Sequence, residues 1–164
     1  MRKGNGGNLP VYLVRHGEAL SELVDPAQPL SERGRSGVER VARHAAAVGV
    51  TVAEVLHSTK LRARETAEIL AEQLTPVRGR AEVEWLAPMA DPGMAQDVIE
   101  SAVEPIMLVG HLPHMARLAS LLLTGNPNRE TVRFRNAAIA CIEKVEDAWV
   151  LVWALSPDVL PPSS

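Results

Sequence analysis

Short apolar runs alternate with amphipathic stretches along most of the chain. The runs at 11–14, 52–56 and 105–109 are rich in β-branched residues and have the length of strands. At 31–48 and 60–74, apolar residues recur at three- and four-residue spacing, as they do on the buried face of a helix. Strands that alternate with helices predict an α/β domain with a largely parallel sheet.

Local signals at the segment ends support these helices. Serine commonly caps helix N-termini, and Ser31 stands at the start of the helical pattern at 31–48. Gly49 follows the last apolar position of this pattern. Pro76 limits the helix at 60–74. Pro113 can occupy the first turn of a further helix that runs to Leu123. A shorter helix is predicted at 94–103, and residues 81–86 are an ambiguous short strand.

The C-terminal part has a different pattern. The apolar segments 137–145 and 149–155 flank a tight turn at Glu146-Asp147, which predicts a β-hairpin. The expected fold is therefore a single-domain, three-layer α/β/α sandwich with a mostly parallel mixed sheet and a C-terminal antiparallel hairpin. Because the strands are almost continuously apolar, we expect the sheet to be covered on both faces.

The chain has 164 residues, of which 46% are hydrophobic, and this length suits one domain with a substantial core. We expect residues 1–8 to be a flexible leader, residues 9–157 the domain, and residues 158–164 a frayed tail. A formal net charge of −3 argues against bulk nucleic-acid binding. No apolar run has the length of a membrane span, and a single cysteine excludes an intrachain disulfide. The expectation is a soluble, cytoplasmic protein, and the lack of a long apolar patch favours a monomer.

Arginine is unusually frequent among the basic residues: there are 14 arginines and only three lysines. Genome composition accounts for most of this excess. A few arginines, however, could stand where a planar guanidinium must hold an oxyanion.

Candidate chemical groups follow three of the predicted strands. Arg15-His16 follows the first, Ser58 to Arg62 follows the second, and Gly110-His111 follows the strand at 106–109. In open α/β sheets, ligands bind outside the carboxyl ends of the strands, so these groups should converge. Two arginines and adjacent helix N-termini can neutralise a phosphoryl group, and a neutral imidazole can attack phosphorus.

These segments resemble the histidine phosphatase (phosphoglycerate-mutase-like) superfamily, and most closely its short SixA-type phosphohistidine phosphatases. The resemblance extends from about Val11 to Pro157. The motifs that carry it are Arg15-His16-Gly17-Glu18, the run from Ser58 to Ala67, Val109 to Pro113, Ala137 to Ala140, and Trp153 to Pro157.

The resemblance implies a role for each matching residue. His16 would be the nucleophile that becomes phosphorylated, and Arg15 and Arg62 would clamp the phosphoryl oxygens. His111 would complete the pocket and stabilise charge in the transition state, with the backbone N–H of Leu112 as a further donor. Glu18 and Ser58 would orient these groups. No metal or cofactor is implied.

Two departures from the superfamily pattern affect the predicted function. Many members have an asparagine a few residues after the His-Gly pair, where this chain has Ala19 to Glu22. Members that hydrolyse phosphate esters also carry a proton-donating glutamate between the second arginine and the second histidine. This chain has no evident insertion in that interval, and Glu82 and Glu84 lie there on a probable strand with an exposed face. The SixA-type proteins also lack this acid, and a phosphoramidate needs less protonation than an alkoxide to leave.

The predicted function is therefore a metal-independent phosphatase that forms a phosphohistidine at His16 and dephosphorylates phosphohistidine on a protein partner. The resemblance implies that this partner could be a histidine-containing phosphotransfer domain. The alternatives are a small phosphomonoesterase acting on a metabolite or nucleotide, and a catalytically silent module that recognises phosphorylated partners. A zinc hydrolase is a weaker alternative that would use His57, His111, His114 and Glu18.

Other polar residues have simpler interpretations. His114 is expected at the surface or at the pocket rim, and His44 in solvent. Cys141 is expected to be a buried apolar filler, and the three tryptophans to be packing residues. Solvated side chains are expected for Arg33, Arg35, Arg40, Arg43, Arg64, Arg129 and Arg133.

Overall fold

A six-stranded mixed sheet forms the centre of the part of the chain that the computed structural model describes, residues 8–162. Its strand order is β3-β2-β4-β1-β5-β6. Strands β3, β2, β4 and β1 are parallel, whereas β5 and β6 form the predicted antiparallel hairpin beside β1. The strands are β1 (Pro10–Arg15), β2 (Glu54–His57), β3 (Arg80–Glu82), β4 (Ile106–Gly110), β5 (Ile139–Val145) and β6 (Ala148–Leu155).

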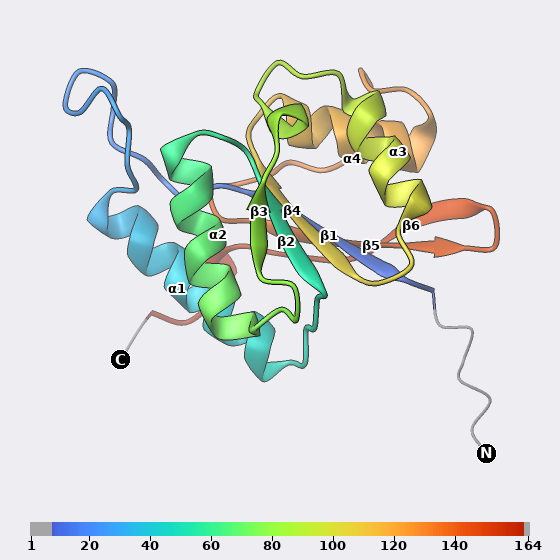
Figure 1. Cartoon of the computed structure of the whole chain (residues 1–164), viewed down its shortest axis with the longest axis horizontal. Helices are drawn as coiled ribbons and strands as arrows, with labels where there is room; N and C mark the ends of the chain where they lie inside the picture. The colour runs from blue at the N-terminus through green and yellow to red at the C-terminus, as the bar shows by residue number, and fades with distance from the viewer. Residues whose placement is uncertain (1–7, 163–164) are drawn as a thin grey trace.

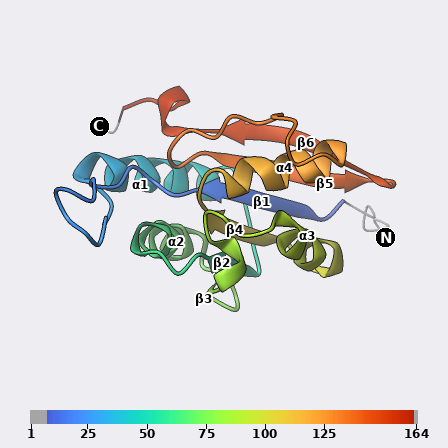
Figure 2. The same ribbon diagram turned by 90° about the horizontal axis from the view of Figure 1, so that it is seen from above.

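Helices cover both faces of this sheet (Figures 1 and 2). Helices α1 and α2 lie on one side, and α3 and α4 lie on the other. The four helices are α1 (Glu32–Ala47), α2 (Leu61–Leu74), α3 (Pro92–Ser101) and α4 (His114–Thr124). Two short 3-10 helices, η1 (Glu84–Leu86) and η2 (Pro157–Val159), complete the secondary structure of the described residues. The predicted three-layer α/β/α fold is confirmed.

Strand β1 shows how the alternating pattern builds two cores. Tyr12 and Val14 are buried against the side of the sheet that α1 and α2 cover. Val11 and Leu13 are buried on the opposite side, among residues of α3 and α4. Successive strand residues point to opposite faces, so a continuously apolar strand must be covered on both.

The N-terminus of α1 is fixed to the loop that follows β1. The Ser31 hydroxyl accepts the Gly34 N–H at 2.9 Å, as predicted for a helix cap. A Cβ at Gly34 would lie 1.9 Å from the Glu18 carbonyl oxygen, so only glycine allows this close approach. The start of α1 therefore holds the segment next to His16 in place.

The sequence-based expectation that both faces of the sheet are covered fails at β6. Val150, Leu151 and Val152 are 37%, 41% and 47% exposed. Strand β6 is the last in the sheet order, so it lies at the edge, beyond most of the helical cover. An exposed apolar edge strand is a surface for association, which weakens the argument for a monomer.

The C-terminal residues up to Pro161 are bonded to α1. The Arg40 guanidinium donates to the carbonyls of Pro157 and Leu160, both at 2.9 Å, and to that of Pro161 at 3.1 Å. Arg40 is therefore not a solvated side chain, because it fastens the chain after β6 to α1. Of the predicted leader, only Asn8 lies within the described residues. Within 8–162, no helix combines the length and apolar character needed to cross a membrane.

Candidate functional site

The predicted site residues converge at the carboxyl ends of three adjacent parallel strands. Arg15 ends β1 and pairs in register with Gly110, which ends the neighbouring β4. His16 and His111 follow these two residues directly, and their ring centroids are 5.0 Å apart. Ser58 follows β2 on the other side of β4, and its N–H donates to the Val109 carbonyl at 3.1 Å. The strand order thus brings together groups that lie far apart in the sequence.

The hydrogen bonding of His16 suits a nucleophile. Its Nδ1 lies 2.7 Å from the carbonyl oxygen of Gly17. A carbonyl only accepts, so Nδ1 carries the proton and Nε2 keeps its lone pair. Burial, aided by the charges of Arg62 and Arg15, lowers the pKa of His16 to about 4 against the opposing effect of the Gly17 bond. The imidazole is therefore neutral near pH 7.

His111 is buried and held by Ser58. Its Nε2 lies 2.7 Å from Ser58 Oγ, which also accepts the Lys60 N–H at 3.2 Å. Among the described residues, Nδ1 of His111 is buried without a hydrogen-bond partner. If the Ser58 hydroxyl donates to Nε2, Nδ1 carries the proton and can donate to a bound anion. Burial, followed by the charges of His16 and Arg62, lowers the pKa of His111 to about 3.

Arg15 and Arg62 supply positive charge that no carboxylate cancels. Nη1 of Arg15 donates to the Phe134 carbonyl at 3.0 Å, which fixes the side chain while leaving most of its donors free. Neither guanidinium forms an ion pair with any residue between 8 and 162. Burial lowers the pKa of both, which still remain charged at neutral pH. Two partly buried and uncompensated guanidinium groups favour an anionic ligand.

The structure gives the predicted orienting residues different contacts. Ser58 contacts His111, as expected. Glu18 instead accepts the Ser31 hydroxyl at 2.9 Å, so its side chain supports the start of α1 rather than a histidine. Leu112 follows His111 at the entry to α4, and the role of its backbone N–H stays a prediction.

His114 lies in the interior, in contrast to the sequence-based expectation of a surface or rim position. It is fully buried, and neither ring nitrogen has a hydrogen-bond partner among the described residues. The first turn of α4 buries His114 with Met115 in the apolar layer between α4 and the sheet. Burial, together with the charge of Arg117, lowers the pKa of His114 to about 4. This imidazole is a neutral part of the core.

The zinc alternative finds no geometric support. Across residues 8–162, no three histidine, cysteine or carboxylate side chains are grouped closely enough to hold a metal ion. Glu82 and Glu84 are exposed, as expected. Within the same range, no carboxylate is among the groups that shift the pKa of His16 or His111. Among residues 8–162, no carboxylate forms a hydrogen bond or ion pair with His16, His111, Arg15 or Arg62.

Thr66 is a residue to which sequence reasoning assigned no role. Its Oγ1 accepts the Gly17 N–H at 3.0 Å and donates to the Arg62 carbonyl at 2.8 Å. The hydroxyl therefore connects the segment that carries His16 to the helical turn that carries Arg62. The sequence does contain a signal for the bond to Arg62, because a threonine hydroxyl in a helix commonly donates to the carbonyl four residues before it.

We expect Thr66→Val to lower kcat/KM by about tenfold while the chain remains folded, since small displacements of reacting groups reduce rates strongly. Thr66→Ser, which keeps the hydroxyl, should restore most of the activity. Thr124→Val is a matched control, because Thr124 makes the same type of bond to Ser120 at 2.8 Å at the far end of α4. Equal activity of Thr66→Val and wild type, measured per folded molecule, would contradict this role.

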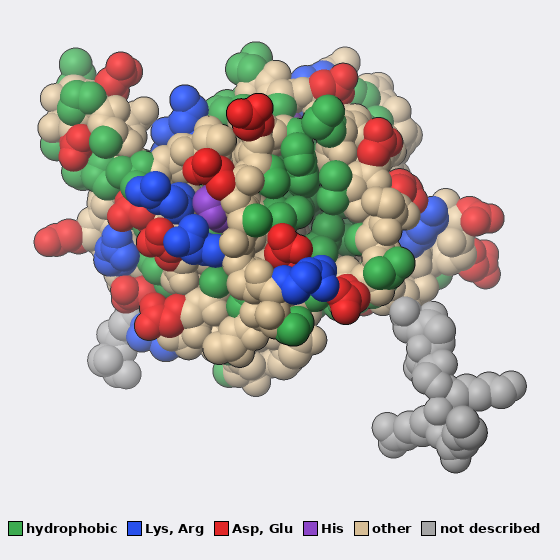
Figure 3. Space-filling model, in the orientation of Figure 1, with side chains coloured by type: hydrophobic (Ala, Val, Ile, Leu, Met, Phe, Trp, Pro, Cys, Tyr) green, Lys and Arg blue, Asp and Glu red, His purple; other side chains and the backbone are tan. Residues whose placement is uncertain are grey.

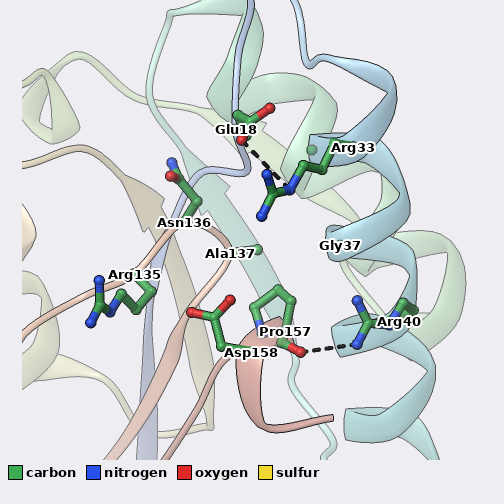
Figure 4. A pocket seen from close by; sticks show the side chains of 10 residues that line it. Glu18, Arg33, Gly37, Arg40, Arg135, Asn136, Ala137, Pro157 and Asp158 are labelled. Carbon is green, nitrogen blue, oxygen red and sulfur yellow. Dashed lines mark hydrogen bonds and ion pairs between the residues drawn. The ribbon is translucent and has the colours of Figure 1, made fainter. Parts of the chain in front are cut away.

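A pocket of about 240 Å³ lies between the first half of α1, residues 135–137 and η2 (Figure 4). Asn136 joins it to the site, because Nδ2 of Asn136 lies 3.5 Å from the His16 carbonyl oxygen. Arg33 lines the side of the pocket formed by α1, and Asp158 lines the side formed by η2. The pocket therefore adjoins the backbone of His16, whereas its lining contains none of Arg15, His16, Arg62 and His111.

Comparison with known proteins gives a consistent result. The model of the histidine phosphatase superfamily (branch 1) matches residues 11–85. The chain is 26% identical over 155 residues to the phosphohistidine phosphatase SixA of Escherichia coli (strain K12), covering 91% of this chain and 94% of that protein. A SixA structure complexed with tungstate superimposes with a TM-score of 0.78 at 25% identity, over 92% of this chain and 98% of that one. A phosphoserine phosphatase mutant from Entamoeba histolytica shares the fold, with a TM-score of 0.71 at 15% identity and coverage of 93% and 100%.

These matches support the histidine phosphatase superfamily, to whose model the N-terminal part of the chain is similar. The chain is accordingly an enzyme of the phosphatase class, and among its relatives it is similar to the SixA proteins over nearly the whole length of both chains.

Proposed function

We propose that the chain is a phosphohistidine phosphatase that acts through a phosphorylated His16. The observation that carries the proposal is the state of His16: a neutral ring, anchored through Nδ1 to the Gly17 carbonyl, with Nε2 unprotonated and the charges of Arg15 and Arg62 acting on the ring. An imidazole in this state has the lone pair needed to attack phosphorus.

The proposed reaction has two displacements. In the first, Nε2 of His16 attacks the phosphorus atom of the substrate, a P–N bond to His16 forms, and the bond to the leaving group breaks. Arg15 and Arg62 would hold the phosphoryl oxygens and balance their charge, which is the contribution a metal ion makes in other phosphatases. In the second, water attacks phosphorus, the P–N bond breaks with its electron pair returning to Nε2 of His16, and inorganic phosphate leaves carrying both protons of the water.

Within residues 8–162 no carboxylate is bonded to His16, His111, Arg15 or Arg62, and this supports phosphohistidine as the substrate. An alkoxide leaving group requires a proton as its bond to phosphorus breaks, and general acid catalysis of this kind contributes about 10²- to 10⁴-fold. Glu82 and Glu84 are exposed, and Glu18 is bonded to Ser31. A protonated imidazole leaves more readily, so a site without an acid is better suited to a phosphoramidate. The similarity to SixA supports the same substrate class.

A substrate comparison tests this proposal. The panel contains a histidine-phosphorylated phosphotransfer domain, free phosphoramidate, and alkyl and aryl phosphate esters. We expect kcat/KM for the phosphohistidine protein to exceed that for alkyl esters by about 100-fold or more, because only the esters need an acid. Faster turnover of alkyl esters would instead favour the phosphomonoesterase alternative. Failure to hydrolyse any member of the panel would favour a silent recognition module.

A further inference from the structure

A loop beside the site presents two apolar side chains to solvent. It connects β1 to α1, and its tip carries Leu23, which is 99% exposed, and Val24, which is 71% exposed. Figure 1 shows this segment standing away from the body of the domain. In Figure 3 the same projection displays hydrophobic and acidic side chains. Two adjacent apolar residues so fully in water have no packing role within the described chain.

The tip is nevertheless held in one conformation by its own hydrogen bonds. The Ser21 carbonyl accepts the N–H groups of Val24 and Asp25, both at 3.0 Å. The Asp25 side chain accepts the Ala27 N–H at 3.0 Å, and the Asp25 carbonyl accepts that of Gln28 at 2.9 Å. These bonds order the loop with its apolar residues facing outward. Little conformational entropy therefore remains to be lost when a partner contacts them.

The base of the loop is attached to the helix that carries Arg62. At one end, the Gly17 N–H donates to Thr66, and at the other, the Leu30 N–H donates to Glu65 Oε1 at 2.9 Å. An antiparallel bridge between Ala19 and Leu30 closes the base. Because two consecutive residues of α2 hold both ends, the direction of the tip is fixed relative to the proposed phosphoryl pocket.

We infer that Leu23 and Val24 form a docking contact for a phosphorylated protein substrate. The inference rests on the proposed function and specifies the size class of its substrate. A small phosphate compound would bind between the arginines and histidines and would not reach a tip that projects beyond them. A protein that delivers a phosphohistidine to His16 must bring its surface against the rim, where a projecting Leu-Val pair can enter an apolar depression. Binding residues are found disproportionately on loops that a rigid scaffold holds in position.

The test is the double variant L23S/V24S, assayed on a histidine-phosphorylated phosphotransfer domain and on free phosphoramidate. We expect kcat/KM for the phosphoprotein to fall about tenfold through a higher KM, with kcat and the hydrolysis of phosphoramidate unchanged. Val103→Ser is the matched control: Val103 is 88% exposed and precedes β4, at the opposite end of the sheet. It should leave both activities at the wild-type level.

Each remaining outcome has a distinct meaning. Unchanged kcat/KM of L23S/V24S on the phosphoprotein overturns the docking contact while leaving the proposed function intact. An equal loss on both substrates also overturns it, because the loop would then support the site itself. Wild-type enzyme that hydrolyses phosphoramidate but no phosphoprotein defeats the protein-directed function and the docking contact together. A dimer of wild type that the double variant converts to monomer assigns the tip to a second copy of the chain and overturns the proposal.

Discussion

His16→Ala should lower turnover of phosphohistidine substrates by at least about 10³-fold, because it removes the group that we propose accepts the phosphoryl group. His111 lies beside it, but His111 Nε2 is bonded to Ser58, so it cannot take over the attack without breaking that bond. The measurement is rapid quenching with ³²P-labelled substrate. Wild type should yield an acid-labile, base-stable phosphoprotein, and His16→Ala should yield none.

The control for this experiment is His44→Ala, because His44 lies exposed on α1. It should leave both turnover and labelling unchanged. Mass spectrometry of the quenched wild-type protein should place the phosphate on the peptide that contains His16. Full activity of His16→Ala, or labelling that persists in it, would contradict the proposed mechanism.

The site could be predicted from the sequence because its residues stand at the ends of strands. The apolar runs indicated where β1, β2 and β4 end, and parallel neighbours bring such ends together whatever their separation in the chain. His16, Ser58 and His111 therefore meet as expected. The helix boundaries were equally readable, since Ser31 and Gly49 act locally.

The interpretation of single polar residues was less successful, because it depends on what packs above them. The first turn of α4 buries His114, although an isolated histidine near a helix start more commonly faces solvent. The expectation of a solvated Arg40 fails for the same reason, since the carbonyls that accept its hydrogen bonds lie more than 100 positions away. Thr66 and Glu65 accept hydrogen bonds from the β1–α1 loop, and no local sequence pattern predicts these contacts.

The buried imidazoles should make the folded chain less stable in acid. His114 is fully buried, and its pKa is about 4 in the folded chain against an ordinary value of 6.5. Between these pH values, the unfolded chain binds a proton that the folded chain does not. The contribution of the neutral His114 to the free energy of unfolding is therefore complete above about pH 6.5 and is lost as the pH falls toward 4. For His114 alone this loss reaches about 3 kcal/mol at pH 4.

His114→Leu should flatten this pH dependence. Leucine fills similar space without two unsatisfied nitrogens, so the variant should be at least as stable as wild type at pH 7 and clearly more stable at pH 4.5. Urea unfolding at several pH values measures the difference, and His44→Leu, which changes an exposed imidazole, is the control. His111 shares the buried environment, so some acid sensitivity should persist in the variant. A slope of unfolding free energy against pH identical to that of wild type would show that the His114 imidazole is not held neutral by the fold.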